Sequence, residues 1–280
     1  MKKLLSRIEK ALSDRYDERE LKYVSKALCL ELLGIGQTTF FLKEEIILSI
    51  EDEERLNGAL HRLNEGEPLQ YVIGKTQFCG LSLIVDSNVL IPRPETGELI
   101  EWICESIQEK EVRLLDIGTG SGCIAIALSN RFKSWKIEGW DISQEAISIS
   151  NRNNIENGTS VSFSRCDILS DIVSDVKYDI IVSNPPYVTD SERKEMEDTV
   201  VNYEPHQALF VPDSSPLLFY RAIAQFGKKS LRKKGHLFFE INPLFADEMI
   251  KMLDEYGYEN IMTRKDIFGK TRMIKANINE

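Results

Sequence analysis

The sequence predicts an α/β protein in which a mostly parallel sheet follows a small helical domain. From residue 96 onward, short apolar runs typical of strands alternate with longer amphipathic runs typical of helices. The first 73 residues have apolar side chains at helical spacing and show no such alternation. The chain has 280 residues and is 42% hydrophobic, so it can bury a core and form more than one domain.

The segment 1–73 is predicted to be an N-terminal helical bundle. Helical spacing is present in "LLSRIEKAL" and again in "ERELKYVSKALCLELLGIG", which ends on glycines as a helix C-terminus does. Residues 74–95 alternate around a turn at Cys79 and Gly80 and then reach a doubled X-Pro step, which predicts a hairpin linker. The remaining segment, 96–280, holds the sheet.

Seven strands are predicted in this last segment. They are "VRLLDIG", "KIEGWDIS", "VSFSRCDIL", "YDIIVSN", "GHLFFEIN", "ENIMTRKD" and "TRMIKANI". The helices between most of them imply parallel strands with both faces of the sheet covered. Only "DIFGK" separates the last two, so no crossover helix fits and this pair is predicted to be antiparallel.

Composition excludes several classes of protein. The net charge of −10 disfavours a general nucleic-acid binder. No apolar run approaches the ~18 residues that span a bilayer, and charges interrupt the N-terminal apolar stretch as they would not in a signal peptide. The five cysteines are scattered and the three histidines lie far apart. We therefore expect a cytoplasmic protein with reduced thiols, no membrane contact and no metal site.

The run "LLDIGTGSGCIAIAL" (114–128) combines a strand, a glycine-rich turn and an apolar helix. Glycines allow the backbone to turn sharply and to approach a ligand closely. Asp141 ends the following strand, where an acid can accept hydrogen bonds from both ribose hydroxyls of a nucleoside. Together these features predict a nucleoside cofactor; the alternative is that the glycines only tighten a turn. The candidate residues of the loop are Asp116, Gly118, Thr119, Gly120, Ser121 and Gly122.

The loop lacks the third glycine of a dinucleotide-binding fingerprint, and this absence disfavours a dinucleotide cofactor. A dinucleotide fingerprint requires a glycine where Cys123 stands. S-adenosylmethionine has no phosphate, and Asp116 could hold its ammonium group directly or through water. Asp167, after the third strand, could accept from the adenine amino group while Ile168 covers the ring. The alternative for Asp167 is a helix or turn cap.

The run "SNPPYV" places a rigid corner at the end of the strand "YDIIVS". Pro185 and Pro186 lack backbone donors and end the strand, which leaves carbonyl oxygens without partners. An amide or aryl amine is a poor nucleophile because its nitrogen lone pair is delocalised. The Asn184 side-chain oxygen and the Pro185 carbonyl can accept its two N–H groups, aim the lone pair and stabilise the growing charge. Tyr187 can supply a flat face; the alternative is a simple Asn-Pro turn.

These motifs carry a resemblance to a known family. "DIGTGSG" with "IVSNPPY" resembles the S-adenosylmethionine-dependent amino methyltransferases, which have a Rossmann-like fold. The segment "GEPLQYVIGKTQFCGLSLIVDSNVLIPRPET" (66–96) is similar to the linker of the release-factor glutamine methyltransferases, the HemK or PrmC family. "YEPHQAL" (203–209) and "DIFGKTR" (266–272) also match that family, so the resemblance covers essentially the whole chain.

The resemblance implies an activity and a set of site residues. The enzyme would methylate N5 of the glutamine in the Gly-Gly-Gln motif of class I peptide release factors and form S-adenosylhomocysteine. The helical domain would help to bind the release factor, and a monomer is expected by default. Cofactor contacts are implied for Gly118 to Gly122, Asp141, Ile168 and Asn184, and glutamine contacts for Asn184, Pro185, Pro186 and Tyr187. Arg93, Glu95 and Thr96 would lie near the pocket.

The sequence departs from the family pattern at three positions: Gly97, Asn242 and Ile168. Other functions remain as alternatives. A ribosomal-protein glutamine methyltransferase has a different run after Ile-Pro-Arg. An adenine-N6 DNA methyltransferase shares Asn-Pro-Pro-Tyr but should have a basic target-recognition domain. A non-catalytic or nicotinamide-binding protein is disfavoured by Cys123 and by the Asn184 corner.

Two further segments are distinctive. Residues 188–215 form a long polar insertion after the Asn-Pro-Pro-Tyr corner, and we expect it to order when the release factor binds. The alternative is a solvated helix and loop. The only dense basic run, 228–236, is predicted at a helix end, where cations complement the helix dipole.

Overall fold

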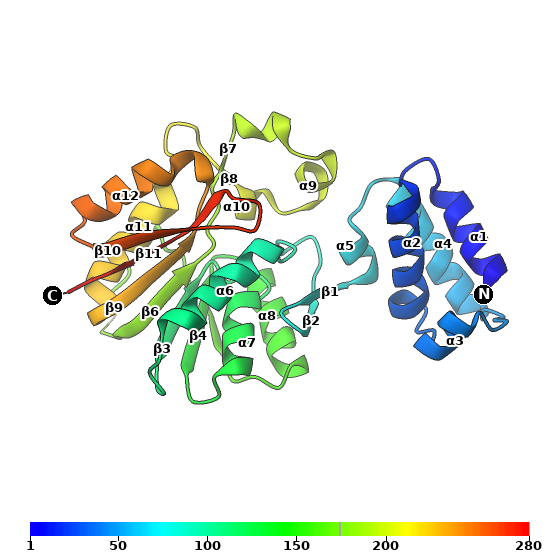
Figure 1. The fold of residues 1–280 in the computed structure, drawn as a ribbon, viewed down its shortest axis with the longest axis horizontal. Helices are drawn as coiled ribbons and strands as arrows, with labels where there is room; N and C mark the ends of the chain where they lie inside the picture. Colours follow the sequence, from blue (N-terminus) through cyan, green and yellow to red (C-terminus); the bar gives the residue numbers. More distant parts are fainter. Residues whose placement is uncertain (174, 280) are drawn as a thin grey trace. The chain divides into compact units, whose positions relative to one another are not determined.

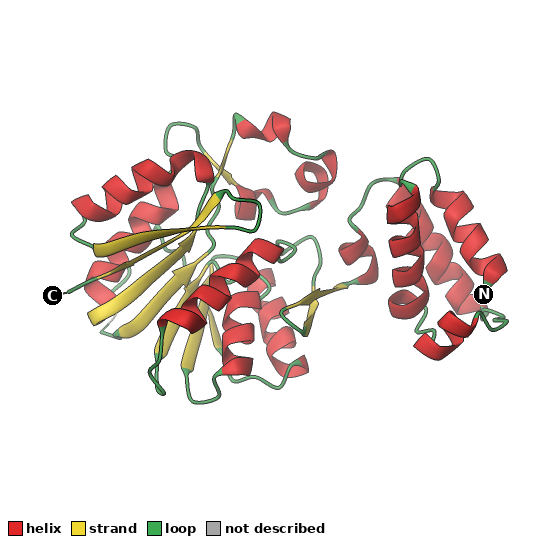
Figure 2. Cartoon of the chain, in the orientation of Figure 1, coloured by secondary structure: helices red, strands yellow, loops and turns green. Residues whose placement is uncertain are grey.

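The computed structural model describes residues 1–173 and 175–279, which form two compact units. The first unit comprises residues 1–75 and 197–203, and the second comprises residues 76–196 and those from 204 onward. The first unit contains helices, whereas the second combines a central sheet with helices, as Figures 1 and 2 show. Within the described residues, no helix has both the length and the apolar character needed to cross a membrane.

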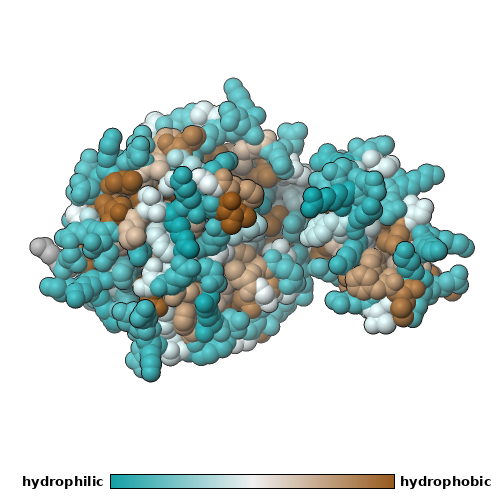
Figure 3. Space-filling view, viewed as in Figure 1, coloured by the Kyte–Doolittle hydropathy of each residue, from teal (hydrophilic) through white to brown (hydrophobic). Residues whose placement is uncertain are grey.

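The first unit is the helical bundle that the sequence predicts. Its helices are α1 (Lys2–Leu12), α2 (Glu18–Ala27), α3 (Gln37–Leu42), α4 (Ile50–Asn64), α5 (Leu69–Ile73) and α9 (Asp198–Tyr203), with a π-helical turn at Leu28–Leu32. Asp17 caps α2 in a reciprocal capping box with Glu20. Ile8, Leu28 and Leu56 are fully buried and hold the bundle together. The sequence did not predict α3, where Phe41 is exposed and apolar surface is visible in Figure 3.

The second unit is built on a seven-stranded sheet. In chain order its strands are β3 (Arg113–Ile117), β4 (Lys136–Asp141), β5 (Ser162–Arg165), β6 (Tyr178–Ser183), β9 (Leu231–Glu240), β10 (Glu259–Lys265) and β11 (Thr271–Asn277). Their spatial order is β10-β11-β9-β6-β3-β4-β5. β11 pairs antiparallel with both β9 and β10, and all other pairs are parallel. The predicted fold class, including the antiparallel last pair, is confirmed.

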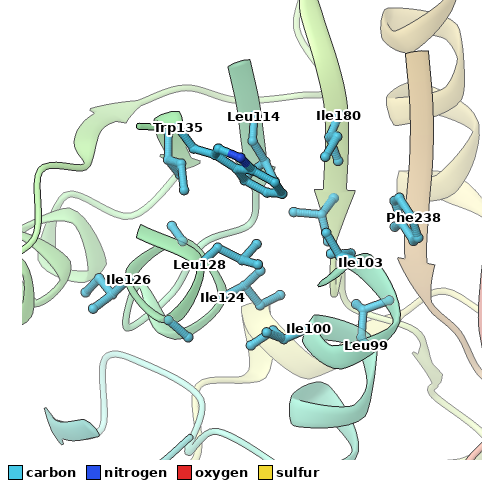
Figure 4. Packing of buried hydrophobic residues seen from close by; sticks show 14 of the residues in the cluster. Leu99, Ile100, Ile103, Leu114, Ile124, Ile126, Leu128, Trp135, Ile180 and Phe238 are labelled. Atoms are coloured by element: carbon cyan, nitrogen blue, oxygen red, sulfur yellow. The ribbon is translucent and has the colours of Figure 1, made fainter. Parts of the chain in front are cut away.

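Helices cover both faces of this sheet, as Figure 1 shows. They are α6 (Pro94–Ser106), α7 (Cys123–Arg131), α8 (Gln144–Glu156), α11 (Leu218–Ser230) and α12 (Ala246–Glu255). Neighbouring residues of a strand belong to opposite cores: Leu114 packs with α6 and α7, whereas Leu115 packs with α11 and α12. Figure 4 shows the first of these cores, with Leu114, Ile180 and Phe238 facing the helices. The period of two along a strand therefore explains why the strands are apolar throughout.

Shorter elements connect the core to the site. β1 (Lys75–Phe78) and β2 (Leu81–Ile84) form a two-stranded sheet around the turn at Cys79 and Gly80. The insertion contains β7 (Val188–Thr189), a 3₁₀ turn (Glu192–Glu195), α10 (His206–Leu209) and β8 (Phe210–Val211), and β7 pairs in parallel with β8. A 3₁₀ turn, Pro243–Phe245, precedes α12. The hairpin of β1 and β2 was predicted, whereas the other short elements were not. Whether the insertion orders further on binding a partner stays a prediction.

Two element boundaries differ from the sequence prediction. α6 begins at Pro94, two residues before the predicted segment 96–280, because proline fits the first turn of a helix, where no intrahelical donor is needed. The basic run 228–236 lies where a helix ends and a strand begins, as predicted, but the strand begins at Leu231, before its predicted start at Gly235. α11 stops at Ser230, and the following basic residues belong to β9, whose register is irregular at that end.

Gly122 ends the glycine loop and lies close to side chains of α7, α8 and β5. Its φ is 82°, a conformation that side chains rarely adopt. A Cβ there would lie 2.8 Å from Ile126 Cδ1, 3.0 Å from Phe163 Cζ and 3.1 Å from Ser150 Cβ. Glycine at this position therefore lets α7 pack against β5 and α8.

Gly122→Ala should destabilise the second unit by about 1–3 kcal/mol, because the new methyl group is overpacked and the backbone is strained. The matched control is Gly97→Ala in α6, where a Cβ meets only ordinary contacts, Cys79 Sγ at 3.4 Å and Phe78 Cε2 at 3.9 Å. That change should stabilise by about 0.5–1 kcal/mol. Urea unfolding of both variants measures the difference, and equal midpoints would contradict the packing argument.

Candidate active site

The parallel register brings three loops to the same edge of the sheet. Ile117, the last residue of β3, pairs with Trp140 of β4 and with Ser183 of β6. The next residues along the three strands are Gly118, Asp141 and Asn184. The carboxyl ends of parallel strands are where such folds bind ligands. The two separate motifs of the sequence thus meet at one place.

The glycine loop is fixed by hydrogen bonds to β4. The backbone N–H groups of Gly118 and Thr119 both donate to the Trp140 carbonyl, at 2.8 and 2.9 Å. Asp141 accepts from the Gly120 N–H at 2.8 Å through Oδ2 and from the Ser143 N–H at 2.9 Å through Oδ1. Burial raises the pKa of Asp141, and these backbone hydrogen bonds oppose the rise. Each oxygen of Asp141 keeps a second lone pair for a ligand.

A cavity of about 430 Å³ lies over these strand ends. This volume is within the usual range for small-molecule sites, about 300–1,000 Å³. Predicted residues that line it are Gly118, Thr119, Gly120, Ser121, Asp141, Asp167, Ile168, Asn184, Pro185 and Pro186. Arg93 and Thr96 line it as well. One structure therefore brings together the glycine loop, the acidic strand end and the Asn-Pro-Pro corner.

Four predicted residues lie outside this lining: Glu95, Asp116, Gly122 and Tyr187. Gly122 serves packing, as described above. Asp116 is fully buried beneath the loop and accepts from Thr119 Oγ1 at 2.6 Å. Tyr187 donates its hydroxyl to Glu240 Oε1 at 3.1 Å. Asp167 both lines the cavity and caps a turn, since its Oδ1 accepts from the Leu169 N–H at 2.9 Å.

Two buried polar atoms near the loop lack protein partners among the described residues. Asp116 Oδ1 and Ser121 Oγ each lack a partner in ordinary hydrogen-bond geometry there, although the Ala125 backbone N–H lies close enough to lower the pKa of Asp116 and the Cys123 thiol lies beside Ser121. Burial raises the pKa of Asp116 to about 7, although the bond from Thr119 works against this rise. Buried groups without partners are uncommon in folded proteins. A ligand with polar groups, such as the amino-acid part of a nucleoside cofactor, fits this end of the cavity.

The carboxamide of Asn184 is part of a buried hydrogen-bond network that the sequence did not reveal. Its Nδ2 donates to Thr96 Oγ1 at 3.3 Å, and Thr96 Oγ1 donates to Glu240 Oε2 at 2.6 Å. Burial raises the pKa of Glu240, while its bonds from Thr96 and Tyr187 and the nearby charge of Arg272 oppose the rise. In the sequence, the sign that Glu240 could belong to the site was its place at the end of β9, at the same sheet edge as Asn184.

Two further contacts brace the corner and the insertion. Glu204 is 3% exposed and accepts from Arg93 Nη2 at 2.6 Å. This ion pair joins the runs "IPRPET" and "YEPHQAL", which lie far apart in the sequence. Asn242 donates through Nδ2 to the Tyr187 carbonyl at 3.1 Å and to Glu192 Oε2 at 3.0 Å. The departure from the family pattern at Asn242 therefore has a role: it holds the corner.

Comparisons with known proteins agree on one family. Residues 99–205 match the methyltransferase small domain, and residues 3–74 match the PrmC N-terminal domain. The chain is 45% identical over 278 residues to a release factor glutamine methyltransferase of Bacteroides thetaiotaomicron, covering 99% of this chain and 100% of the relative. It is 38% identical over 271 residues to one of Flavobacterium psychrophilum, covering 95% of each.

Solved structures support the fold. A methyltransferase of Pyrococcus furiosus aligns with a TM-score of 0.53 at 15% identity, covering 72% of this chain and 90% of that chain. A 16S rRNA methyltransferase of T. thermophilus, solved with AdoMet and guanosine, aligns with a TM-score of 0.52 at 17% identity, covering 73% and 50%. With full-length relatives at up to 45% identity, the chain belongs to the release factor glutamine methyltransferase family.

Proposed function

We propose that this enzyme transfers a methyl group from S-adenosylmethionine to N5 of the glutamine in the Gly-Gly-Gln motif of class I release factors. The single observation that carries the proposal is that Asn184 and Pro185 line the same cavity as the glycine loop and Asp141. The nucleophile and the methyl donor can therefore meet within one site. The names of the relatives, release factor glutamine methyltransferase, support the choice of substrate.

The residues present fit S-adenosylmethionine. Asp141 would accept from the ribose hydroxyls, since each of its oxygens has a lone pair left. Asp167 and Ile168 would contact the adenine, and the loop from Gly118 to Ser121 would contact the methionine part. The cofactor supplies a methyl group made electrophilic by a sulfonium. A T. thermophilus neighbour of the same fold was solved with AdoMet, which supports this cofactor.

The Asn-Pro-Pro-Tyr corner would hold and orient the glutamine. An amide nitrogen attacks poorly because its lone pair is delocalised into the carbonyl. Asn184 Oδ1 and the Pro185 carbonyl would accept the two N–H groups and stabilise positive charge that grows on nitrogen. Holding reactants in this geometry can supply ~7–11 kcal/mol in well-oriented cases. Tyr187 would flank the glutamine, with its ring held by the bond from its hydroxyl to Glu240.

The substrate is a whole protein, and the helical unit would help to recognise it. We propose the domain organisation 1–73, 74–95 and 96–280, with substrate recognition in the first domain. The match of residues 3–74 to the PrmC N-terminal domain supports this division. We further propose that the enzyme acts as a monomer in the cytoplasm, where translation termination occurs, and binds no nucleic acid stably. Its net charge of −10 suits a protein partner better than nucleic acid.

Labelled S-adenosylmethionine tests the substrate. We expect label in a purified class I release factor, and none in factor whose Gly-Gly-Gln glutamine is replaced or in DNA. The adenine-N6 reaction would put label in DNA instead. Label in DNA alone, or in the factor without its glutamine, would end the proposal.

Asn184→Ala should lower kcat by about 100–1000-fold, because removing one group that stabilises transition-state charge has an effect of this order. Binding of S-adenosylhomocysteine should weaken only modestly, since Asp141 and the glycine loop are untouched. Calorimetry and single-turnover transfer measure the two separately. Undiminished turnover would reject the role given to Asn184.

Cofactor affinity should depend on pH through Asp116. Its pKa is about 7, so the carboxyl is mostly protonated below that pH. A bound ammonium group favours the carboxylate, so binding releases a proton, and affinity should fall by up to about tenfold per unit as pH drops below 7. Above pH 7 affinity should level off. Kd for S-adenosylhomocysteine between pH 5.5 and 8 measures this, and Asp116→Asn should remove that part of the slope. An identical slope in both proteins would exclude Asp116 from binding.

A further inference from the structure

The amide of Asn184 can be placed in two ways, and only one suits the proposed reaction. An asparagine side chain can turn over by 180°, which exchanges an acceptor oxygen for a donor NH2 group at nearly the same position. With Oδ1 facing the cavity, it accepts from a nucleophile's N–H. With Nδ2 facing the cavity, it would repel that N–H. A hydrogen-bond partner within the protein must therefore fix one of the two orientations of the amide.

Thr96 fixes the orientation of the amide because its only hydroxyl hydrogen is already donated to Glu240. Glu240 is 1% exposed and accepts from Thr96 Oγ1 at 2.6 Å, a short distance typical of a bond to a carboxylate. Glu240 is itself fixed, because Tyr187 donates to its other oxygen and Tyr220 donates to its backbone carbonyl at 3.0 Å. Thr96 Oγ1 is left with lone pairs only and can accept but not donate.

The side of Asn184 that meets Thr96 must then be the NH2 group. Nδ2 lies 3.3 Å from Thr96 Oγ1, and Asn184 also lines the cavity. Oδ1 is on the other side of the amide and, among the described residues, is the amide atom that can accept from a ligand. Thr96 lies in α6 and Glu240 at the end of β9, so two elements outside the Asn-Pro-Pro-Tyr run control its chemistry.

We propose that Thr96, held by Glu240, is a positioning residue that turns the Asn184 carboxamide so that Oδ1 faces the nucleophile. That this orientation of the amide favours catalysis rests on the proposed function. The arrangement selects a primary amide or amine, which can donate two N–H groups, over a carboxylate, which can only accept. Glu240 thus determines, through the Thr96 hydroxyl, that the Asn184 side chain presents an acceptor to the substrate.

Thr96→Val and Thr96→Ser test the proposal in the full-length enzyme. Valine keeps the shape of threonine without the hydroxyl, so both orientations of Asn184 become accessible. We expect kcat to fall by about 10–100-fold, with KM for the cofactor within about threefold of the wild type. Serine restores the hydroxyl and should bring kcat back close to the wild-type value. An unchanged kcat in Thr96→Val, or an equal loss in both variants, would overturn the proposal.

A second variant separates positioning from loss of stability. Tyr258→Phe removes another buried hydroxyl bond, from Tyr258 to the Ala224 carbonyl at 2.8 Å, in the same unit but outside the cavity. Both variants should lose stability by about 1 kcal/mol, the net value of one buried hydrogen bond. Only Thr96→Val should lose kcat. A matching loss of kcat in Tyr258→Phe would show that the effect of Thr96 is merely structural.

An NMR readout does not depend on the methylation reaction. The side-chain NH2 of Asn184, assigned through Asn184→Asp, should exchange slowly with solvent in the wild type and in Thr96→Ser. Thr96→Val should make it exchange faster, because the acceptor is gone. Equal exchange in Thr96→Val and wild type would overturn the positioning role. If the wild type fails to methylate release factor, the proposed function falls while this comparison still decides the role of Thr96.

Discussion

The parallel register of β3, β4 and β6 is the constraint on which the site depends. Because Ile117 pairs with Trp140 on one side and with Ser183 on the other, the three strands end at the same level. Residues 23 to 66 positions apart in the sequence are then neighbours because of the register alone. A slip of one residue in either pairing would turn side chains to the opposite face and bury the wrong set. Leu114 and Leu115, which belong to opposite cores, make such a slip unfavourable.

The second feature is a pair of buried carboxyls beneath the cavity. Asp116 and Glu240 are 0% and 1% exposed, and burial raises the pKa of each. Burying a carboxyl is unfavourable unless hydrogen bonds compensate for lost water. Each acid accepts from a threonine, Thr119 or Thr96, that itself lines the cavity. Each buried carboxyl thus takes the hydroxyl hydrogen of its threonine, which leaves the threonine oxygen as an acceptor toward the cavity.

Outside the cavity, long-range contacts fix the loops that frame it. The ion pair between Arg93 and Glu204 connects the linker to the end of the insertion, and Glu204 also accepts from the Ile91 N–H at 3.3 Å. Breaking a buried pair by removing one partner leaves an unpaired charge, which is strongly unfavourable. Asn242 likewise joins the corner to the start of the insertion. The insertion is therefore attached to the site at both of its ends.

The sequence by itself determined the fold class and predicted where the candidate site lies. Alternating strand and helix patterns required a covered parallel sheet, and the short "DIFGK" connection required an antiparallel pair; both are local properties of the chain. The glycine loop, Asp141 and Asn184 were identifiable because each follows a recognisable strand. Only the tertiary structure decided that Thr96 and Glu240 control Asn184, that Glu204 pairs with Arg93, and that Asp116 and Tyr187 stand behind the cavity lining. The contacts of Thr96, Glu204 and Tyr187 join residues 53 to 144 positions apart, and no periodicity or spacing along the chain encodes which distant side chains will meet.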